Sequence, residues 1–175
     1  MHVGEIKFTD CANGPGVRIS MFVSGCTNCC EGCFNTETWD FNYGEEYTEG
    51  MEEDILQELS LDYYAGITIL GGEPFEPQNQ RVLVGLIRKI RERLPKKDIW
   101  MYTGFTYDKD LIEGGRKHTE VTDEILSSIS TLVDGKFILS KRNLMLNFRG
   151  SENQRIIDME KTLDTGSVVL SPLND

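Results

Sequence analysis

Five cysteines are the residues of this 175-residue chain whose type and spacing most directly suggest chemistry. Four of them, Cys26, Cys29, Cys30 and Cys33, lie within eight residues, and Cys11 stands apart. The first residues show no basic segment followed by an apolar stretch, so we expect a cytoplasmic protein with reduced thiols. In that setting, clustered cysteines indicate a metal or redox site before a disulfide framework.

The spacing of the four clustered cysteines narrows the kind of metal site. Two C-x2-C pairs could form a tetrathiolate zinc site, but Cys29 and Cys30 are adjacent and would need an unusual bend to reach one ion. A ferredoxin run would need a cysteine at position 32, where the chain has Gly32. The remaining spacing is C-x3-C-x2-C, formed by Cys26, Cys30 and Cys33. Three thiolates can hold three irons of a cubane cluster and leave the fourth iron open to a small molecule.

A glycine-rich tetrapeptide predicts a ligand site of its own. Residues 71–74, Gly-Gly-Glu-Pro, follow an apolar run at 66–70 that is typical of a strand buried on both faces. Ligands in open α/β sheets and barrels bind at the carboxyl ends of such strands. Glycines allow a ligand to approach the backbone closely, and the Glu73 carboxylate can accept hydrogen bonds from an ammonium group.

The elements that must position these residues alternate along the chain. Apolar runs predict strands at 17–24, 66–70, 98–103, 131–139 and 168–170, and helical periodicity predicts helices at 51–61, 78–94, 108–113, 123–130 and 153–163. This alternation predicts βα units around a parallel sheet. Because a complete eight-fold barrel needs about 250 residues, we expect a single domain, residues 1–175, folded as an α/β incomplete parallel β/α barrel.

Composition excludes several classes of function. A net charge of −11 opposes nucleic-acid binding, because the phosphates would be repelled. We expect no membrane association, because no apolar run approaches the roughly 20 residues that span a bilayer. The acidic run at 45–54 is interpreted as the solvated start of a helix, with a docking patch for a partner as the alternative.

Together, the cysteine spacing and the Gly-Gly-Glu-Pro segment resemble those of the radical S-adenosylmethionine superfamily. The resemblance implies a 4Fe–4S cluster on Cys26, Cys30 and Cys33, with S-adenosylmethionine chelated to the open iron and Cys29 as a bystander. It further implies cofactor contacts from Gly32, Cys33, Phe34, Gly71, Gly72, Glu73, Pro74, Thr103, Asp134 and Lys136.

Individual roles follow from the same resemblance. Glu73 and its glycines would hold the amino group of S-adenosylmethionine. Asp134 and Lys136 would contact its ribose and carboxylate, or would be a surface pair without a ligand. Many members of the family have an aromatic residue before the third cysteine that packs on the adenine. This chain has Gly32 there, so Phe34 or the backbone at 32–34 would have to provide that contact.

Three further segments resemble the activases that install glycyl radicals in partner enzymes. They are residues 13–18 (Asn-Gly-Pro-Gly-Val-Arg), residues 34–39 (Phe-Asn-x-x-Thr-Trp) and the pair 132–137 and 148–154. The last pair is most similar to activators of anaerobic ribonucleoside-triphosphate reductases. The resemblance covers residues 5–158 and leaves the tail unassigned. Arg18 and Arg149 are interpreted either as anchors for a carboxylate or as counter-charges for nearby acids.

By this resemblance, flavodoxin or ferredoxin reduces the cluster and the electron cleaves S-adenosylmethionine. The resulting 5′-deoxyadenosyl radical removes a hydrogen atom from a glycine of anaerobic ribonucleoside-triphosphate reductase. Two alternatives stay open. A small-molecule radical enzyme similar to 7-carboxy-7-deazaguanine synthase would need no protein partner, and a non-catalytic iron–sulfur or zinc interaction protein would hold metal without cleaving S-adenosylmethionine.

Overall fold

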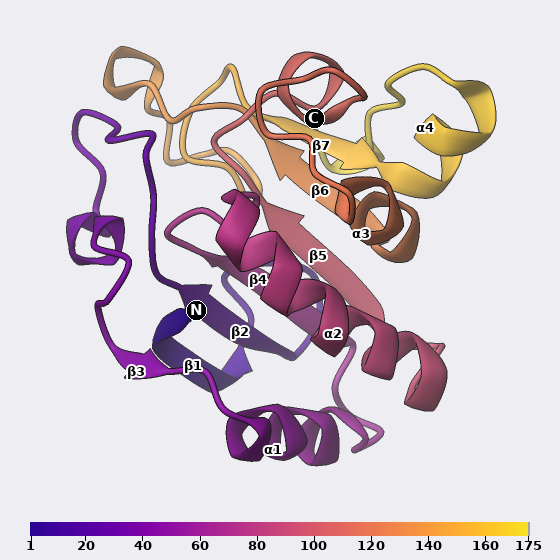
Figure 1. The fold of residues 1–175 in the computed structure, drawn as a ribbon. Helices are drawn as coiled ribbons and strands as arrows, with labels where there is room; N and C mark the ends of the chain where they lie inside the picture. Colours follow the sequence, from indigo (N-terminus) through magenta and orange to yellow (C-terminus); the bar gives the residue numbers. More distant parts are fainter. Residues whose placement is uncertain (175) are drawn as a thin grey trace.

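A seven-stranded sheet organises the computed structural model, which describes residues 1–174 (Figure 1). The strands are β1 (His2–Asp10), β2 (Arg18–Val23), β3 (Glu45–Glu46), β4 (Gly66–Gly71), β5 (Asp98–Tyr102), β6 (Thr131–Asp134) and β7 (Arg155–Asp158). The helices are α1 (Glu49–Leu59), α2 (Pro77–Arg93), α3 (Thr122–Ser128) and α4 (Met159–Thr165). Short helical turns lie at η1 (Thr36–Trp39), η2 (Tyr107–Leu111), η3 (Leu139–Lys141) and η4 (Pro172–Asn174).

The sheet is parallel only in its centre, which corrects the prediction of a parallel sheet throughout. Its order is β3-β1-β2-β4-β5-β6-β7, and β2, β4, β5 and β6 run parallel. Helices α1, α2 and α3 provide the crossovers that parallel neighbours require. The edges of the sheet are antiparallel: β1 pairs with β2 and β3 at one edge, and β7 pairs with β6 at the other. Loops rather than crossover helices connect β1 to β2 and β6 to β7. The fold is therefore a mixed α/β fold with a partly parallel sheet.

Helical periodicity was misleading near the C-terminus. The helix predicted at 153–163 is instead β7 followed by α4, since Ile156 and Ile157 are both fully buried and pair with β6. Strand β1 was not predicted, because polar residues interrupt it along its length. The strand predicted at 131–139 ends at Asp134, and the run at 168–170 makes only an isolated bridge from Leu170 to Ile157.

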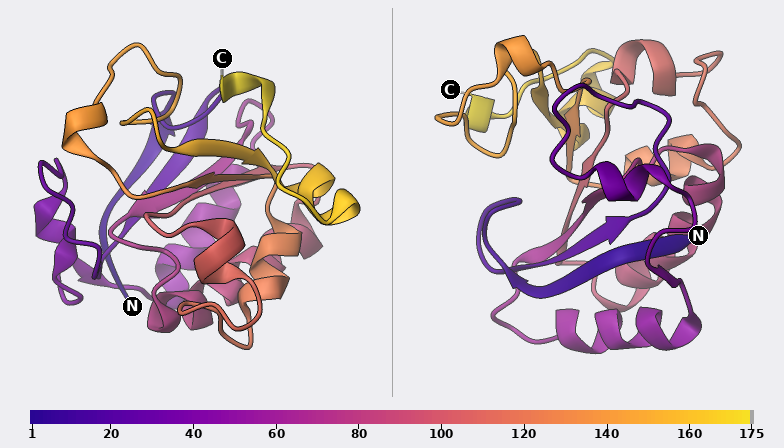
Figure 2. Two further views of the ribbon diagram at one scale, coloured as in Figure 1. Left: turned by 90° about the horizontal axis from the view of Figure 1, so that it is seen from above. Right: turned by 90° about the vertical axis from the view of Figure 1, so that its left-hand side faces the viewer.

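The two faces of the sheet are covered differently. Helices α1, α2 and α3 pack on one face and form the main core with alternate residues of the strands, such as Ile19, Met21 and Ile69 (Figures 1 and 2). On the other face, Trp100 packs against Phe148 in an edge-to-face contact, and loops rather than helices lie over it. Within residues 1–174, no helix combines the length and the hydrophobicity needed to cross a membrane.

Arg18 is fully buried at the amino end of β2. Its guanidinium lies 2.9 Å from the Asp98 carboxylate and donates to the Thr68 hydroxyl and to the carbonyl of Pro15. Of the two interpretations of Arg18, these contacts match a counter-charge for Asp98. They also hold the Gly-Pro-Gly turn against the sheet.

Candidate metal and cofactor site

A cavity of about 380 Å³ lies at the carboxyl ends of β2, β4 and β5. It brings together the cysteine loop, the Gly-Gly-Glu turn, the end of β5 and residues 135–154. The predicted residues that line it are Cys26, Cys30, Cys33, Phe34, Gly71, Gly72, Glu73 and Thr103. Gly32, Pro74, Asp134 and Lys136 are absent from the lining. The sequence therefore identified most of one side of the cavity.

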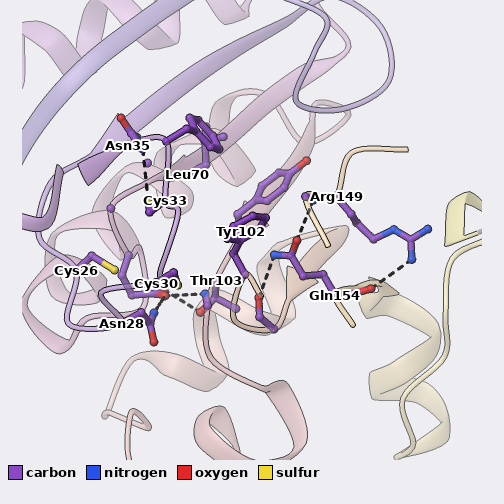
Figure 3. Close-up of a pocket in the computed structure, with 18 of the residues that line it drawn as sticks. Cys26, Asn28, Cys30, Cys33, Asn35, Leu70, Tyr102, Thr103, Arg149 and Gln154 are labelled. Atoms are coloured by element: carbon purple, nitrogen blue, oxygen red, sulfur yellow. Dashed lines mark hydrogen bonds between the residues drawn. The ribbon is translucent and has the colours of Figure 1, made fainter. Parts of the chain in front are cut away.

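The three thiols predicted to hold the cluster lie on one side of this cavity. Arg149 and Gln154 lie on the opposite side, with Tyr102 between the two sides (Figure 3). All three cysteines are free. Burial raises the pKa of the Cys26 thiol to about 11 and also raises the pKa of Cys30. Metal binding must therefore displace protons, so we expect iron uptake to become more favourable as pH rises.

This donor set fits a cubane iron–sulfur cluster. Within the described residues, no group of three or more Cys, His, Asp or Glu is placed to hold a single metal ion. A cubane makes a different demand, because each thiolate binds a separate iron. The backbone N–H of Asn35 donates to Cys33 Sγ at 3.4 Å, the kind of hydrogen bond that tunes the reduction potential of such clusters.

The other cysteines do not line the cavity. Cys29 is exposed and has a left-handed backbone, with φ of 44°, and unlike Cys30 it does not line the cavity. Cys11 is also exposed and lies in the turn before β2. Gly32 also has a left-handed φ of 72°, and a Cβ there would lie 2.8 Å from Leu139 Cδ1. The chain thus has a local steric reason for glycine before the third cysteine.

Glu73 is fully buried and joins three segments of the site. Its carboxylate accepts hydrogen bonds from Asn28 Nδ2 at 2.9 Å and from the Gly104 N–H at 2.8 Å. It also accepts from the Thr103 hydroxyl at 2.8 Å and the Phe75 N–H at 3.0 Å. Burial raises the pKa of Glu73 to about 7, although these donors oppose the shift. Four protein donors fill the acceptor positions of this carboxylate, so it acts here as the junction between the cysteine loop and the strand ends.

A second buried carboxylate, Glu76, holds the same loop and was not predicted. It accepts hydrogen bonds from both the N–H and the hydroxyl of Thr27, and the Lys117 ammonium lies 2.7 Å away. Thr27 lies directly after the first cluster cysteine. The only sequence signal for the role of Glu76 was its position three residues after Glu73. A single sequence does not distinguish such a residue from an ordinary helix start.

Backbone contacts explain the glycines at the strand ends. A Cβ on Gly72 would lie 2.8 Å from the carbonyl oxygens of Gly25 and Thr38. A Cβ on Gly104 would lie 2.5 Å from Asn28 Nδ2. The glycines therefore let the strand ends pack directly against the cysteine loop. Gly72 faces backbone oxygens and Gly104 faces the Asn28 side chain, and the approach of a ligand to the glycines of this turn stays a prediction.

Residues after β6 are largely engaged within the protein. The buried Asp134 pairs with Arg155 and accepts from the Tyr107 N–H, and Lys136 is exposed. Arg149 donates to the carbonyl oxygens of Gln154 and Asn174, so it holds the C-terminal turn rather than an acid. In this structure the Asp134 carboxylate therefore binds protein groups, whereas Arg149 also lines the cavity and its buried Nε has no hydrogen-bond partner among the described residues.

Gln154 organises this side of the cavity. Its side-chain oxygen accepts from the N–H groups of Gly150 and Ser151, and its amide donates to the carbonyl of Gly135. One amide side chain thereby ties both ends of the 135–150 segment together. Gln154, which falls in the 148–154 segment of the resemblance, thus has a structural role beside the site.

Comparisons with known proteins agree with this geometry. Residues 12–157 match the family described as "4Fe-4S single cluster domain". The anaerobic ribonucleoside-triphosphate reductase-activating protein of Pasteurella multocida is 39% identical over 150 residues, covering 85% of this chain and 91% of the relative. The protein of the same name from Escherichia coli K12 is 40% identical over 147 residues, covering 83% and 90%. The one from Enterobacteria phage T4 is 35% identical over 160 residues, covering 89% and 93%.

The match covers the cysteine loop, the Gly-Gly-Glu turn and all but the last residue of β7 in one stretch. It therefore includes every residue that lines the cavity. The chain carries a 4Fe–4S single-cluster domain and belongs to the family of anaerobic ribonucleoside-triphosphate reductase-activating proteins.

Proposed function

We propose that this protein is a radical S-adenosylmethionine activase that generates a glycyl radical on anaerobic ribonucleoside-triphosphate reductase. The observation that carries the proposal is the set of three free thiols, Cys26, Cys30 and Cys33, on one side of a cavity closed by the Gly-Gly-Glu turn. Relatives that match this chain over most of their length bear the name of that activity.

Cys26, Cys30 and Cys33 would hold the 4Fe–4S cluster, which supplies the electron for reductive cleavage of S-adenosylmethionine. Those residues of Gly32–Phe34, Gly71–Pro74 and Thr103 that line the cavity would position S-adenosylmethionine; they are Cys33, Phe34, Gly71, Gly72, Glu73 and Thr103. Asp134 and Lys136 stay candidates for its ribose and carboxylate, although the Asp134 carboxylate faces Arg155 in this structure. The protein's own task is to orient the cofactor and exclude water, which suits the largely apolar wall that includes Phe22, Leu70 and Tyr102.

The proposal extends to the architecture. We infer that residues 1–175 form one domain and that the mixed sheet is an incomplete barrel of the radical S-adenosylmethionine type. The sheet ends in β3 on one side and in β7 on the other and does not close on itself, and loops rather than helices cover its site-bearing face. An open side of this kind suits a substrate that is itself a polypeptide loop.

We further propose that the protein works in the cytoplasm with flavodoxin or ferredoxin as electron donor. Reduced free thiols at the cluster site fit a reducing compartment.

Anaerobic reconstitution with iron and sulfide, followed by dithionite reduction, tests the activity directly. We expect the wild type to convert S-adenosylmethionine to 5′-deoxyadenosine and to give a glycyl-radical signal in electron paramagnetic resonance when the reductase is added. Cys30→Ala should lose both signals. Cys29→Ala is the matched control, because it removes the neighbouring exposed thiol and should retain both.

Other outcomes would replace the proposal. Cleavage that requires a small molecule, with no radical on the reductase, would favour the small-molecule alternative. A stable cluster without any cleavage would indicate an electron carrier, and bound zinc without iron would indicate a structural metal site.

A further inference from the structure

Residues 136–145, called the rim segment below, border the mouth of the cavity. The segment lies beside the cysteine loop at the same end of the molecule (Figures 1 and 2). Leu139 packs over the turn between the second and third cluster cysteines, since its Cδ1 lies 2.8 Å from the point where Gly32 would carry a Cβ. Leu146 and Phe148, which follow the segment, line the cavity itself. The rim segment is thus continuous with the site.

The rim segment and the neighbouring Phe34 carry the most exposed large apolar side chains in residues 1–174. Phe34 is 94% exposed, Met145 89% and Leu144 81%, and the next most exposed, Tyr63, reaches 59%. Phe34 directly follows the third cluster cysteine and lines the same cavity as Leu146. Exposed apolar groups gathered at one place mark interaction sites, and methionine and aromatic residues are enriched in protein interfaces.

The charge of the rim segment is opposite to that of the molecule. The net charge of the chain is −11, yet the rim segment contains Lys136, Lys141 and Arg142 and no acidic residue. All three side chains are exposed, and in the described part of the chain none is within ion-pair distance of a carboxylate. By contrast, exposed arginines on α2 pair with acids, as Arg88 does with Glu124. Unpaired cations at one site attract and orient an acidic partner.

We propose that the rim segment docks an acidic and apolar polypeptide segment of the glycine-bearing reductase. The inference rests on the proposed function, in which a glycine α-carbon reaches the cavity on a polypeptide chain, and the rim segment with its exposed apolar groups lies beside that cavity. Leu144 and Met145 supply apolar contact area, and Lys141 and Arg142 set the approach and orientation. An electron donor has no need to enter the cavity, and electron-transfer contacts are small and transient, so the apolar part of the rim favours the reductase.

Two double variants test the proposal in the reconstituted holoenzyme with dithionite as reductant and the reductase of the same organism as probe. Leu144→Ser with Met145→Ser removes the apolar side chains, and Lys141→Glu with Arg142→Glu reverses the charge. The matched controls are Leu61→Ser, an exposed apolar residue elsewhere, and Lys96→Glu with Lys109→Glu, two exposed lysines outside the rim. The measurements are reductase affinity, glycyl-radical yield, and cleavage of S-adenosylmethionine without reductase.

We expect the apolar double variant to bind the reductase about 10- to 100-fold more weakly, as for truncated interface anchors. Charge reversal should slow association about tenfold at low salt, with a smaller effect at high salt. Both variants should keep partner-free cleavage within about twofold of wild type, since surface changes seldom alter stability strongly. The controls should bind the reductase like wild type.

Several results would overturn the inference. Wild-type affinity in both double variants would show that the rim is not a docking surface. Defects that appear only when flavodoxin replaces dithionite would assign the rim to the electron donor. Loss of partner-free cleavage in both variants would show that the segment builds the site itself. If the wild type cleaves S-adenosylmethionine but leaves no radical on the reductase, the proposed function fails, and the inference fails with it.

Discussion

The cysteine loop (residues 26–33) and the rim segment border the same cavity but are held in different ways. Two buried carboxylates hold the cysteine loop through side-chain contacts, Glu73 at Asn28 and Glu76 at Thr27. The rim segment leaves Leu144 and Met145 in solvent, and backbone contacts with residues 150–153 hold it: the Ile138 N–H donates to Ser151 Oγ, and the Glu152 N–H donates to the Lys141 carbonyl.

This difference matches two kinds of task. Cluster ligands must be placed in advance, and buried, fully satisfied polar groups give that placement. A surface that meets another protein instead needs accessible apolar and charged groups, and its own packing contributes less to stability. The comparison predicts that substitutions beneath the cysteine loop cost folding stability, whereas substitutions in the rim cost partner binding.

Glu73→Ala should have the largest effect on stability. It removes the common acceptor of Asn28, Thr103 and two backbone N–H groups, all in a buried place. We expect a loss of about 3–5 kcal/mol in the free energy of unfolding, because several buried donors lose their partner. Urea denaturation of the metal-free protein in reducing buffer measures this loss. A loss below about 1 kcal/mol would show that the carboxylate is not the junction described.

The titration of Glu73 gives a second test of the same buried network. Its pKa rises from an ordinary 4.5 to about 7 on folding, chiefly through burial. Between these values the folded protein binds a proton that the unfolded chain does not, so this group's contribution to stability is largest below pH 4.5 and falls as pH rises to about 7. The loss amounts to about 3 kcal/mol.

Glu73→Gln is the control for that titration, because glutamine cannot ionise. The difference in unfolding free energy between wild type and Glu73→Gln should shift against the wild type from pH 5 to pH 8. A difference that stays constant over this range would contradict the assigned pKa.

Glu76→Gln should have an intermediate effect. Glutamine can still accept from Thr27, but it removes the charge that faces Lys117 and leaves that partly buried ammonium without its partner. We expect a loss of about 2 kcal/mol and a lower iron content after reconstitution. Glu120→Gln is a suitable control, because it breaks an exposed pair with Arg81 and should cost under about 1 kcal/mol. Equal losses in the two variants would remove the distinction between the buried and exposed pairs.

Gln154→Ala should have the smallest effect on stability. It frees the N–H groups of Gly150 and Ser151 and the carbonyl of Gly135 at a partly buried position. We expect a loss of about 1 kcal/mol, together with faster amide hydrogen exchange in residues 135–150 than in the cysteine loop. Equal acceleration in both regions would mean that they are not held independently.

Much of the site was predictable from the sequence because its chemistry is local. Cys26, Cys30 and Cys33 lie within one loop, and their spacing alone excludes several metal sites. The Gly-Gly-Glu turn follows an apolar strand, and the order of strands along the chain places it at the cavity. The central strands β2, β4 and β5 were predicted within one or two residues, because short apolar runs have few other solutions.

The predictions that failed depend on distant partners. Ile156 and Ile157 form a strand only because β6 offers an edge, while the surrounding periodicity favours a helix. β1 has too few apolar residues to be recognised as a strand from the sequence. It forms a strand through its hydrogen-bonded pairing with β2 and β3. Antiparallel edges likewise follow from which strands meet, and a single sequence does not contain that information.

By itself, the sequence determined the cluster-type cysteine spacing, the glycine-rich turn, the helices that cross between parallel strands and the negative charge of the molecule. Only the tertiary structure decided that Glu73 and Glu76 hold the cysteine loop, that Arg18 serves Asp98 and that the cations of the rim stand unpaired beside exposed apolar groups. The reason is physical. Ligand spacing and turn preference act over a few residues, whereas burial and hydrogen-bond partnership depend on segments that meet only when the sheet has formed.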